Sequence, residues 1–200
     1  MKLFSLTLII IIWFLIFQYK RSQATRLDKQ ATEAFWRKER EANTTRRADL
    51  SQLNYIQIPL ERLPFRETKD ESLQLIQNAV RELAGKQIVN LTGISNTDLK
   101  LKYGAPNIDK LSEYDGNFTL LVRNLNQWGQ YLYDNGFSDD ARTVLEFSIQ
   151  CKSDVRNTYL LLARIYSETG HSEKIQGLIK AAETLNTILK NSILDALKKY

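Results

Sequence analysis

The chain has 200 residues, a formal net charge of +5 and a single cysteine. This length allows one folded domain of ordinary size plus an appendage, and one cysteine excludes a disulfide within the chain. Residues 20–50 hold nine basic and five acidic residues, whereas residues 51–200 hold 18 of each sign. A nucleic-acid-binding domain would carry its basic residues on the folded body, so this distribution disfavours nucleic acid as a partner.

The first element is an apolar run, Leu3–Phe17, which Lys2 precedes and Lys20 and Arg21 follow. Extended by Gln18-Tyr19 it would form a helix of about 25 Å, at the short end of what crosses a bilayer. We therefore expect residues 1–19 to be a transmembrane anchor. A cleaved signal peptide is the alternative, because residues 22–24 (Ser-Gln-Ala) resemble a cleavage site, although two basic residues separate them from the apolar run.

The charges around this run predict its orientation. Six basic residues lie within about 20 positions after it and only Lys2 lies before it, so the positive-inside rule places the rest of the chain in the cytoplasm. Residues 20–50 carry apolar residues at helical spacing and are expected to form a basic juxtamembrane helix or stalk. Its charge would attract anionic lipid, or serve only to set the topology.

Residues 51–200 are expected to form an α-helical domain. The segment Tyr55–Phe65 contains two prolines and many large apolar residues, so it should be extended and dock along the helices. Glu67–Ala84 is predicted to be an amphipathic helix, and a capping box at residues 95–98 should open a short helix that Gly104 closes. Another short helix should begin near Pro106 and end before residues 115–116 (Asp-Gly).

From about residue 119 the sequence repeats with a period of 34. Gly136 matches Gly170 and Gly129 matches Ala163 at this spacing. In each unit an apolar helix is followed by a glycine suited to a left-handed turn, and then by a serine, 138 or 172, suited to an N-cap. The small residue in the first helix would let the second helix approach closely. This pattern resembles the tetratricopeptide repeat.

The resemblance implies an all-α, short helical-hairpin solenoid, preceded by the transmembrane and juxtamembrane helices. Its repeats would span about residues 119–152 and 153–186. A C-terminal capping helix would follow, with apolar residues Ile188, Leu189, Ile193, Leu194 and Leu197. A plain bundle of helical hairpins is the alternative, because there are two copies, neither has the closing proline, and Ile175 replaces a small residue.

Similar repeats hold a peptide in the groove lined by the first helix of each unit. Carried over by register, this groove would present Arg123, Asn126, Gln130, Tyr133, Asn157, Leu160, Arg164 and Ser167. The two cations and the amides would bind an acidic or C-terminal carboxylate group through charge-assisted hydrogen bonds. A solvated face without a ligand is the alternative.

No combination of residues predicts catalysis, a cofactor or a metal ion. The only histidine, His171, follows a glycine in a predicted turn, and Cys151 has no histidine partner that could activate it. We therefore expect no enzyme but a membrane-anchored scaffold or adaptor for a protein or peptide partner. The alternative is an exported or envelope structural protein whose helical domain lies outside the membrane.

Overall fold

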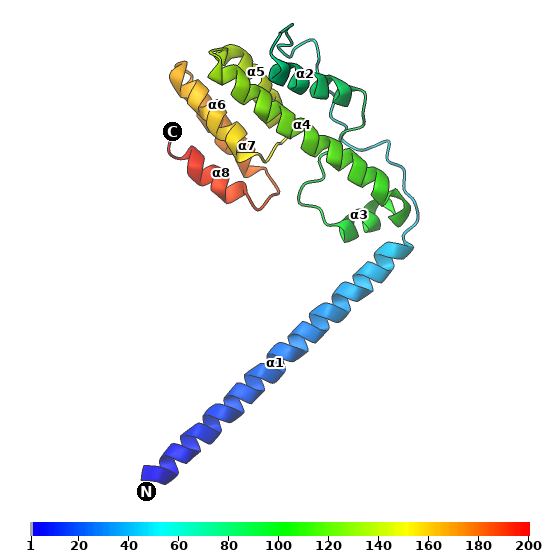
Figure 1. Cartoon of the computed structure of the whole chain (residues 1–200). Helices are drawn as coiled ribbons and strands as arrows, with labels where there is room; N and C mark the ends of the chain where they lie inside the picture. Colours follow the sequence, from blue (N-terminus) through cyan, green and yellow to red (C-terminus); the bar gives the residue numbers. More distant parts are fainter. Residues whose placement is uncertain (1) are drawn as a thin grey trace. The chain divides into compact units, whose positions relative to one another are not determined.

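The computed structural model describes the backbone of residues 2–200 and the side chains from Ile12 onward. Within this range the protein is all-α, as predicted, with eight α-helices and one isolated bridge between Tyr55 and Val89 (Figure 1). The chain divides into two compact units. Unit 1 is the chain up to Ala48 together with residues 96–106, and unit 2 is residues 49–95 and 107–200.

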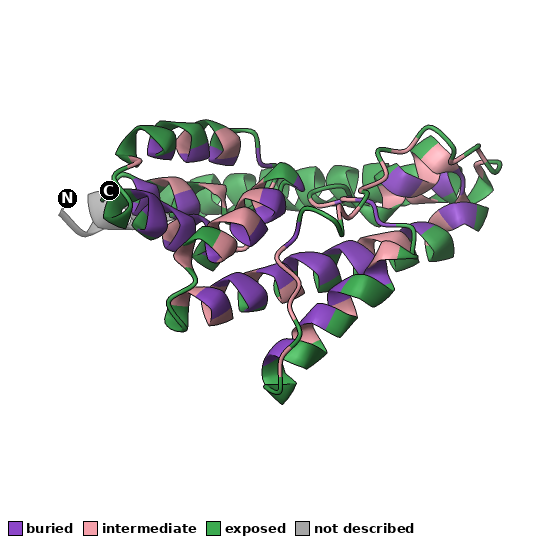
Figure 2. Ribbon diagram, turned by 90° about the horizontal axis from the view of Figure 1, so that it is seen from above, coloured by how far each residue is buried: buried purple, intermediate pink, exposed green. Residues whose placement is uncertain are grey.

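Unit 1 contains α1 (Lys2–Thr44) and α3 (Asn96–Tyr103). The described side chains of α1 are exposed along most of its length (Figure 2), but near its end Ala42 is fully buried. There Lys100 Nζ lies 2.5 Å from Glu39 Oε1, and Thr97 Oγ1 donates to the same carboxylate at 2.6 Å. Gly104, with φ of 90°, ends α3 as predicted.

Most of the predicted anchor, residues 1–19, lies outside the residues whose side chains the structure describes. In the part of the chain that is described, no helix combines the length and the apolar character that a membrane crossing requires.

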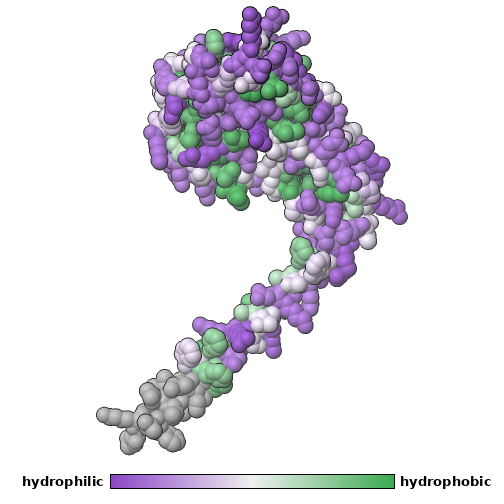
Figure 3. All heavy atoms as spheres, in the orientation of Figure 1, coloured by the Kyte–Doolittle hydropathy of each residue, from purple (hydrophilic) through white to green (hydrophobic). Residues whose placement is uncertain are grey.

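Unit 2 contains six of the α-helices, and successive helices pack on one another (Figure 1). They are α2 (Glu71–Ala84), α4 (Ile108–Asp134), α5 (Ser138–Gln150), α6 (Arg156–Glu168), α7 (Ile175–Glu183) and α8 (Lys190–Leu197). Helix α4 packs against α2, α5 and α6, while α8 packs against α6 and α7. On the visible face of this unit hydrophilic residues predominate, and hydrophobic residues gather in small separate groups (Figure 3).

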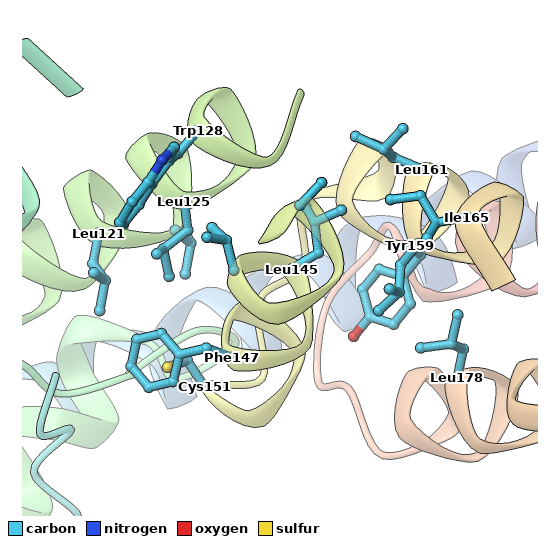
Figure 4. Close-up of a cluster of buried hydrophobic side chains, with 14 of the residues drawn as sticks. Leu121, Leu125, Trp128, Leu145, Phe147, Cys151, Tyr159, Leu161, Ile165 and Leu178 are labelled. Carbon is cyan, nitrogen blue, oxygen red and sulfur yellow. The ribbon is translucent and has the colours of Figure 1, made fainter. Parts of the chain in front are cut away.

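One continuous hydrophobic core runs from α2 to α8. Figure 4 shows its centre, where side chains of α4, α5, α6 and α7 point toward one another. The largest fully buried side chains there include Trp128, Leu145, Tyr159 and Ile165. Removing this apolar surface from water is the main source of the unit's stability.

The glycine turns follow the prediction, but the N-caps do not. Gly136 and Gly170 have φ of 82° and 77°, the left-handed conformation expected after a helix. The predicted N-caps, Ser138 and Ser172, are instead the first residues of α5 and of a 3-10 helix. The residue after each glycine closes the previous helix by donating its N–H to a carbonyl, as Phe137 does to Leu132 at 2.8 Å. The next helix therefore begins one residue earlier than the N-cap prediction assumed.

Three helix boundaries also differ from the prediction. Helix α2 begins at Glu71 and not at Glu67, because the Asp70 side chain caps it by accepting the backbone N–H groups of Ser72 and Leu73. The expected break before residues 115–116 was wrong, because α4 continues through Gly116 to Asp134. Ile188 and Leu189 were expected in the last helix, but α8 begins only at Lys190. Ile188 is 97% exposed and Leu189 is 41% exposed.

The Tyr55–Phe65 segment docks on the helices, as predicted, but it is not extended throughout. Residues 60–62 form a turn, in which Arg62 donates its backbone N–H to the Pro59 carbonyl at 2.9 Å. Ile56 donates its backbone N–H to Ile88 at 2.9 Å. Leu63 is buried, and the Phe65 ring lies 4.7 Å from that of Trp128. Its two prolines prevent a continuous helix, and its apolar side chains give it a surface to bury.

Candidate functional site

The predicted groove residues lie on α4 and α6, and we call the eight of them the polar face. Three of them form a direct contact. The Asn157 amide donates to Asn126 Oδ1 at 3.1 Å and to Gln130 Oε1 at 3.2 Å. Thr158, which the sequence did not single out, also donates to Asn126 Oδ1, at 3.2 Å. These bonds fix the side-chain amides in the middle of the polar face.

A second cluster lies further along both helices. Tyr133 donates its hydroxyl to both carboxylate oxygens of Glu168 at 2.9 Å, and this hydrogen bond raises the Tyr133 pKa. The Arg164 guanidinium interacts with the side chains of Tyr200 and Tyr133, and these hydrogen bonds raise the pKa of Arg164. Arg164 is therefore influenced by two tyrosine side chains, and one of them, Tyr133, donates its hydroxyl to the Glu168 carboxylate.

The remaining three residues are not brought into these clusters. Arg123 is exposed on α4, and Leu160 is half-buried on α6. Ser167 donates its hydroxyl to the Ala163 carbonyl of its own helix at 3.0 Å, which leaves it less available to a ligand. Neither Arg123 nor Arg164 forms an ion pair with any residue that the structure describes.

A cavity of about 480 Å³ lies elsewhere in unit 2, and sequence reasoning missed it. It is lined by Asn54, Ile56, Asn90, Thr92, Ile94, residues 150–152, Asp154 and residues 184–187. These residues come from four separate segments, so no local spacing could reveal the cavity. The sequence offered one indication of a polar surface there, since Asn and Thr recur in residues 90–97 and 184–187.

Among residues 12–200, no group of three or more His, Cys, Asp and Glu side chains lies in a position to hold a metal ion. Comparisons of the chain with protein-family models, curated proteins and solved structures found no match.

Proposed function

We propose that this protein is a membrane-anchored interaction module whose polar face binds an acidic or C-terminal carboxylate group of a protein partner. One observation is the main support for this proposal. Arg123 and Arg164 are exposed on α4 and α6, two helices that pack on one another, and neither forms an ion pair within the described residues. A planar guanidinium binds a carboxylate through two parallel hydrogen bonds, so such cations suit this partner.

The neighbouring side chains favour a defined geometry for this contact. The side chains of Tyr133 and Tyr200 interact with Arg164 and would restrict its guanidinium before a ligand arrives. Less side-chain entropy is then lost on binding. Glu168, whose carboxylate accepts the Tyr133 hydroxyl, keeps its negative charge, so a bound carboxylate should lie on the side of Arg164 away from Glu168. The side-chain amides of Asn126, Gln130 and Asn157 can pair with the backbone of the same peptide.

We further propose that α4–α7 are two stacked helical hairpins similar to tetratricopeptide repeats. Hydrogen bonds between α4 and α6 join residues 27 to 35 positions apart, with 27 for Gln130 with Asn157 and 35 for Tyr133 with Glu168. Helices in parallel register give this pattern. The close approach of α5 to Gly129, together with the two left-handed glycines, also supports stacked hairpins.

The membrane part of the proposal rests on the sequence. The apolar run Leu3–Phe17 is followed by an excess of basic residues, which favours a retained anchor with a cytoplasmic domain. The exposed basic side chains of α1 would then lie near anionic lipid headgroups. Neither nucleic acid nor a cofactor is needed for this function. The alternative, an exported structural protein, differs in the side of the membrane on which unit 2 lies.

The proposal is tested with the double variant Arg123→Ala/Arg164→Ala. Loss of two charge-assisted hydrogen bonds, about 1.5–3 kcal/mol each, should reduce capture of the native partner from detergent-solubilised membranes at least tenfold. Both side chains lie on the outer side of their helices, so the free energy of unfolding should change by less than about 0.5 kcal/mol. Quantitative mass spectrometry of the captured proteins is the measurement.

The matched control removes two exposed cations elsewhere in unit 2, Lys110 and Lys180, which form no ion pair with described residues. Lys110→Ala/Lys180→Ala has the same net charge as the test variant. It should capture the same partners as the wild type. If all three proteins capture the same set, the polar face is not the binding surface.

A further inference from the structure

Residues 45–70 join α1 to α2 without forming a helix, and the isolated bridge at Tyr55 is their only strand-like pairing. Connections of more than about 12–15 residues without secondary structure are uncommon, and most of them are functional or disordered. The part of this connection nearest to α2 that packs closely on the helices is Leu63–Arg66, which we call the strap. Leu63 is the only buried residue of the whole connection, and residues 60–62 and 67 on both sides of the strap are exposed.

Arg66 is held through its backbone and through its side chain. Gln77, which is 1% exposed, accepts the Arg66 N–H at 2.7 Å and donates to the Arg66 carbonyl at 3.0 Å. The Arg66 guanidinium forms an ion pair with Asp140, and its Cζ atom lies 4.0 Å from the centre of the Phe137 ring. A glutamine side chain carries a donor and an acceptor, as a peptide group does, so it pairs with a backbone as a neighbouring strand would.

Phe65 is held through its ring. The ring centre lies 4.7 Å from that of Trp128, which is fully buried in α4, and 4.5 Å from Cζ of the exposed Arg81 on α2. The ring therefore contacts the core through Trp128 and a surface cation through Arg81. Aromatic and arginine side chains held in this way supply much of the binding energy in complexes between proteins.

The strap pocket consists of the residues that hold Phe65 and Arg66, namely Gln77, Arg81, Trp128, Phe137 and Asp140. They belong to α2, to α4, and to α5 with the turn before it. Helix α4 packs directly against α2 and α5, so the walls of the pocket do not depend on the strap. A separate chain with the same two residues could form the same contacts, since none of them requires a covalent connection.

The strap can open at a lower cost than the unfolding of unit 2. The Arg66 and Asp140 side chains are 30% and 35% exposed, and ion pairs so close to water contribute little to stability. Only the Leu63 side chain is buried in the strap, whereas the helices share a continuous core. Regions with few buried contacts open locally while the rest of the protein stays folded.

We propose that the strap pocket is a peptide-binding site, which the strap fills in the free protein and a partner segment takes when the strap opens. The strap defines the chemistry of this partner, an aromatic residue followed directly by arginine. Trp128 receives the ring, Gln77 pairs with the backbone of the arginine, and Asp140 pairs with its guanidinium. This site goes beyond the polar face, with which it shares no residue, and its partner segment is basic and not acidic.

The test uses the labelled peptide fluorescein-Leu-Pro-Phe-Arg-Glu-amide, which copies residues 63–67, and measures its binding to the full chain by fluorescence polarisation. Phe65→Ala/Arg66→Ala removes the two side chains that fill the pocket. The peptide should bind this variant at least about tenfold more tightly than the wild type, because a site that is open in few molecules binds with an affinity reduced by the open fraction. Arg66→Ala alone, which keeps the Phe65 ring on Trp128, should show the same change to a smaller extent.

Two altered peptides identify the contacts in the Phe65→Ala/Arg66→Ala variant. A peptide with alanine in place of phenylalanine should bind at least about tenfold more weakly. Adding Asp140→Asn should weaken binding of the original peptide about threefold, but should not affect a peptide with glutamine in place of arginine.

Arg62 supplies the matched control, because it is exposed and forms no ion pair within the described residues. Arg62→Ala removes the same charge as the strap variants and should bind the peptide as the wild type does. Adding Arg123→Ala/Arg164→Ala to the strap variant should leave binding unchanged, which separates this site from the polar face. Two results would overturn the proposal: equal binding to the wild type and to the strap variants, or an equal effect of Asp140→Asn on both peptides.

Amide hydrogen exchange of the unaltered protein tests the opening itself, whether or not the variants fold. The protection factor of the Arg66 N–H should be at least about tenfold lower than those of Leu125 and Leu132, which are buried in α4. Equal protection would mean that the strap leaves the pocket only when unit 2 unfolds, which would also overturn the proposal.

Discussion

Gly129 lies where α5 packs closely on α4. A Cβ at this position would lie 2.5 Å from Leu145 Cδ2 and 2.6 Å from its Cγ, and Leu145 is fully buried. The contact explains why a small residue occurs in mid-helix despite its poor helix propensity. The sequence pattern predicted this close approach, and the structure confirms it.

Gly129→Ala should therefore lower the free energy of unfolding by about 1–3 kcal/mol through overpacking. Gly116 is the matched control, since it lies in the same helix and a Cβ there would meet no atom within 4 Å. Gly116→Ala should raise the free energy of unfolding by about 0.5–1 kcal/mol, because alanine loses less backbone entropy. Urea denaturation measures both. Shifts of the same sign and size would show that Leu145 does not restrict Gly129.

The burial of Cys151 predicts how the stability of the protein changes with pH. Burial raises the pKa of its thiol from 9.0 to about 12, so the unfolded chain ionises this thiol at a lower pH than the folded chain does. The stability that depends on the protonated Cys151 thiol is fully present below about pH 9. Above that pH the free energy of unfolding falls, by up to about 1.4 kcal/mol for each pH unit. Burial also raises the pKa of Tyr159 and Tyr166, with the same sign but from a higher ordinary value of 10.0.

Denaturation should accordingly be measured between about pH 8 and 10, where the thiol dominates. Cys151→Ala should be less stable at every pH, because a small cavity remains, but its stability should fall less steeply over this range. Parallel curves for the two proteins would mean that the folded thiol titrates normally.

At the scale of the elements, α4 shows that a buried apolar helix face can override a local turn signal. Asp-Gly at 115–116 favours a turn, yet Leu111, Phe118, Leu121 and Leu125 are all buried on one side of the helix. Gly116 is exposed on the other side, where its cost is roughly 0.5–1 kcal/mol. Burial of these four side chains outweighs that cost, so the helix continues.

The Gln77 bonds to Arg66 connect α2 to the extended segment. Gln77→Leu would leave the Arg66 N–H and carbonyl without their partner in a partly buried place, at up to about 1–3 kcal/mol for each unsatisfied group. We expect lower stability and faster proteolysis within residues 55–66. Gln74→Leu, on the exposed side of the same helix, is the control and should change neither. Equal cleavage rates for the two variants would contradict this role of Gln77.

At the scale of the whole molecule, the side of the membrane on which unit 2 lies has a direct test. A reporter fused after Tyr200 should be active only in a form that works in the cytoplasm, because the basic excess follows the apolar run. Replacing Lys20 and Arg21 with glutamine should weaken this preference. Activity of an exported-only reporter, such as a periplasmic phosphatase, would favour the exported structural protein instead. N-terminal sequencing of the same fusion distinguishes a retained anchor from a cleaved peptide.

The sequence alone determined the helical class, the left-handed glycines, the close approach at Gly129 and the docking of the two-proline segment. All four depend on local physics: apolar residues at helical spacing, the φ angles open to glycine, and the fixed φ of proline. The eight residues of the polar face could be placed on α4 and α6 by register. Which of these residues form hydrogen bonds with one another could not be predicted, because this depends on the side-chain rotamers at the contact between the two helices.

Three features could be seen only in the tertiary structure: the cavity of about 480 Å³, the continuity of α4 and the exposure of Ile188. The lining of this cavity includes residues as far apart in the chain as Asn54 and Thr187, and such proximity leaves no periodicity in the sequence. Amide bonds such as those between Gln77 and Arg66 likewise follow from two segments being brought together, whereas an isolated glutamine in a helix reads as an ordinary surface residue. Local propensities determine the elements, and the burial of shared apolar surface determines which of their polar groups meet.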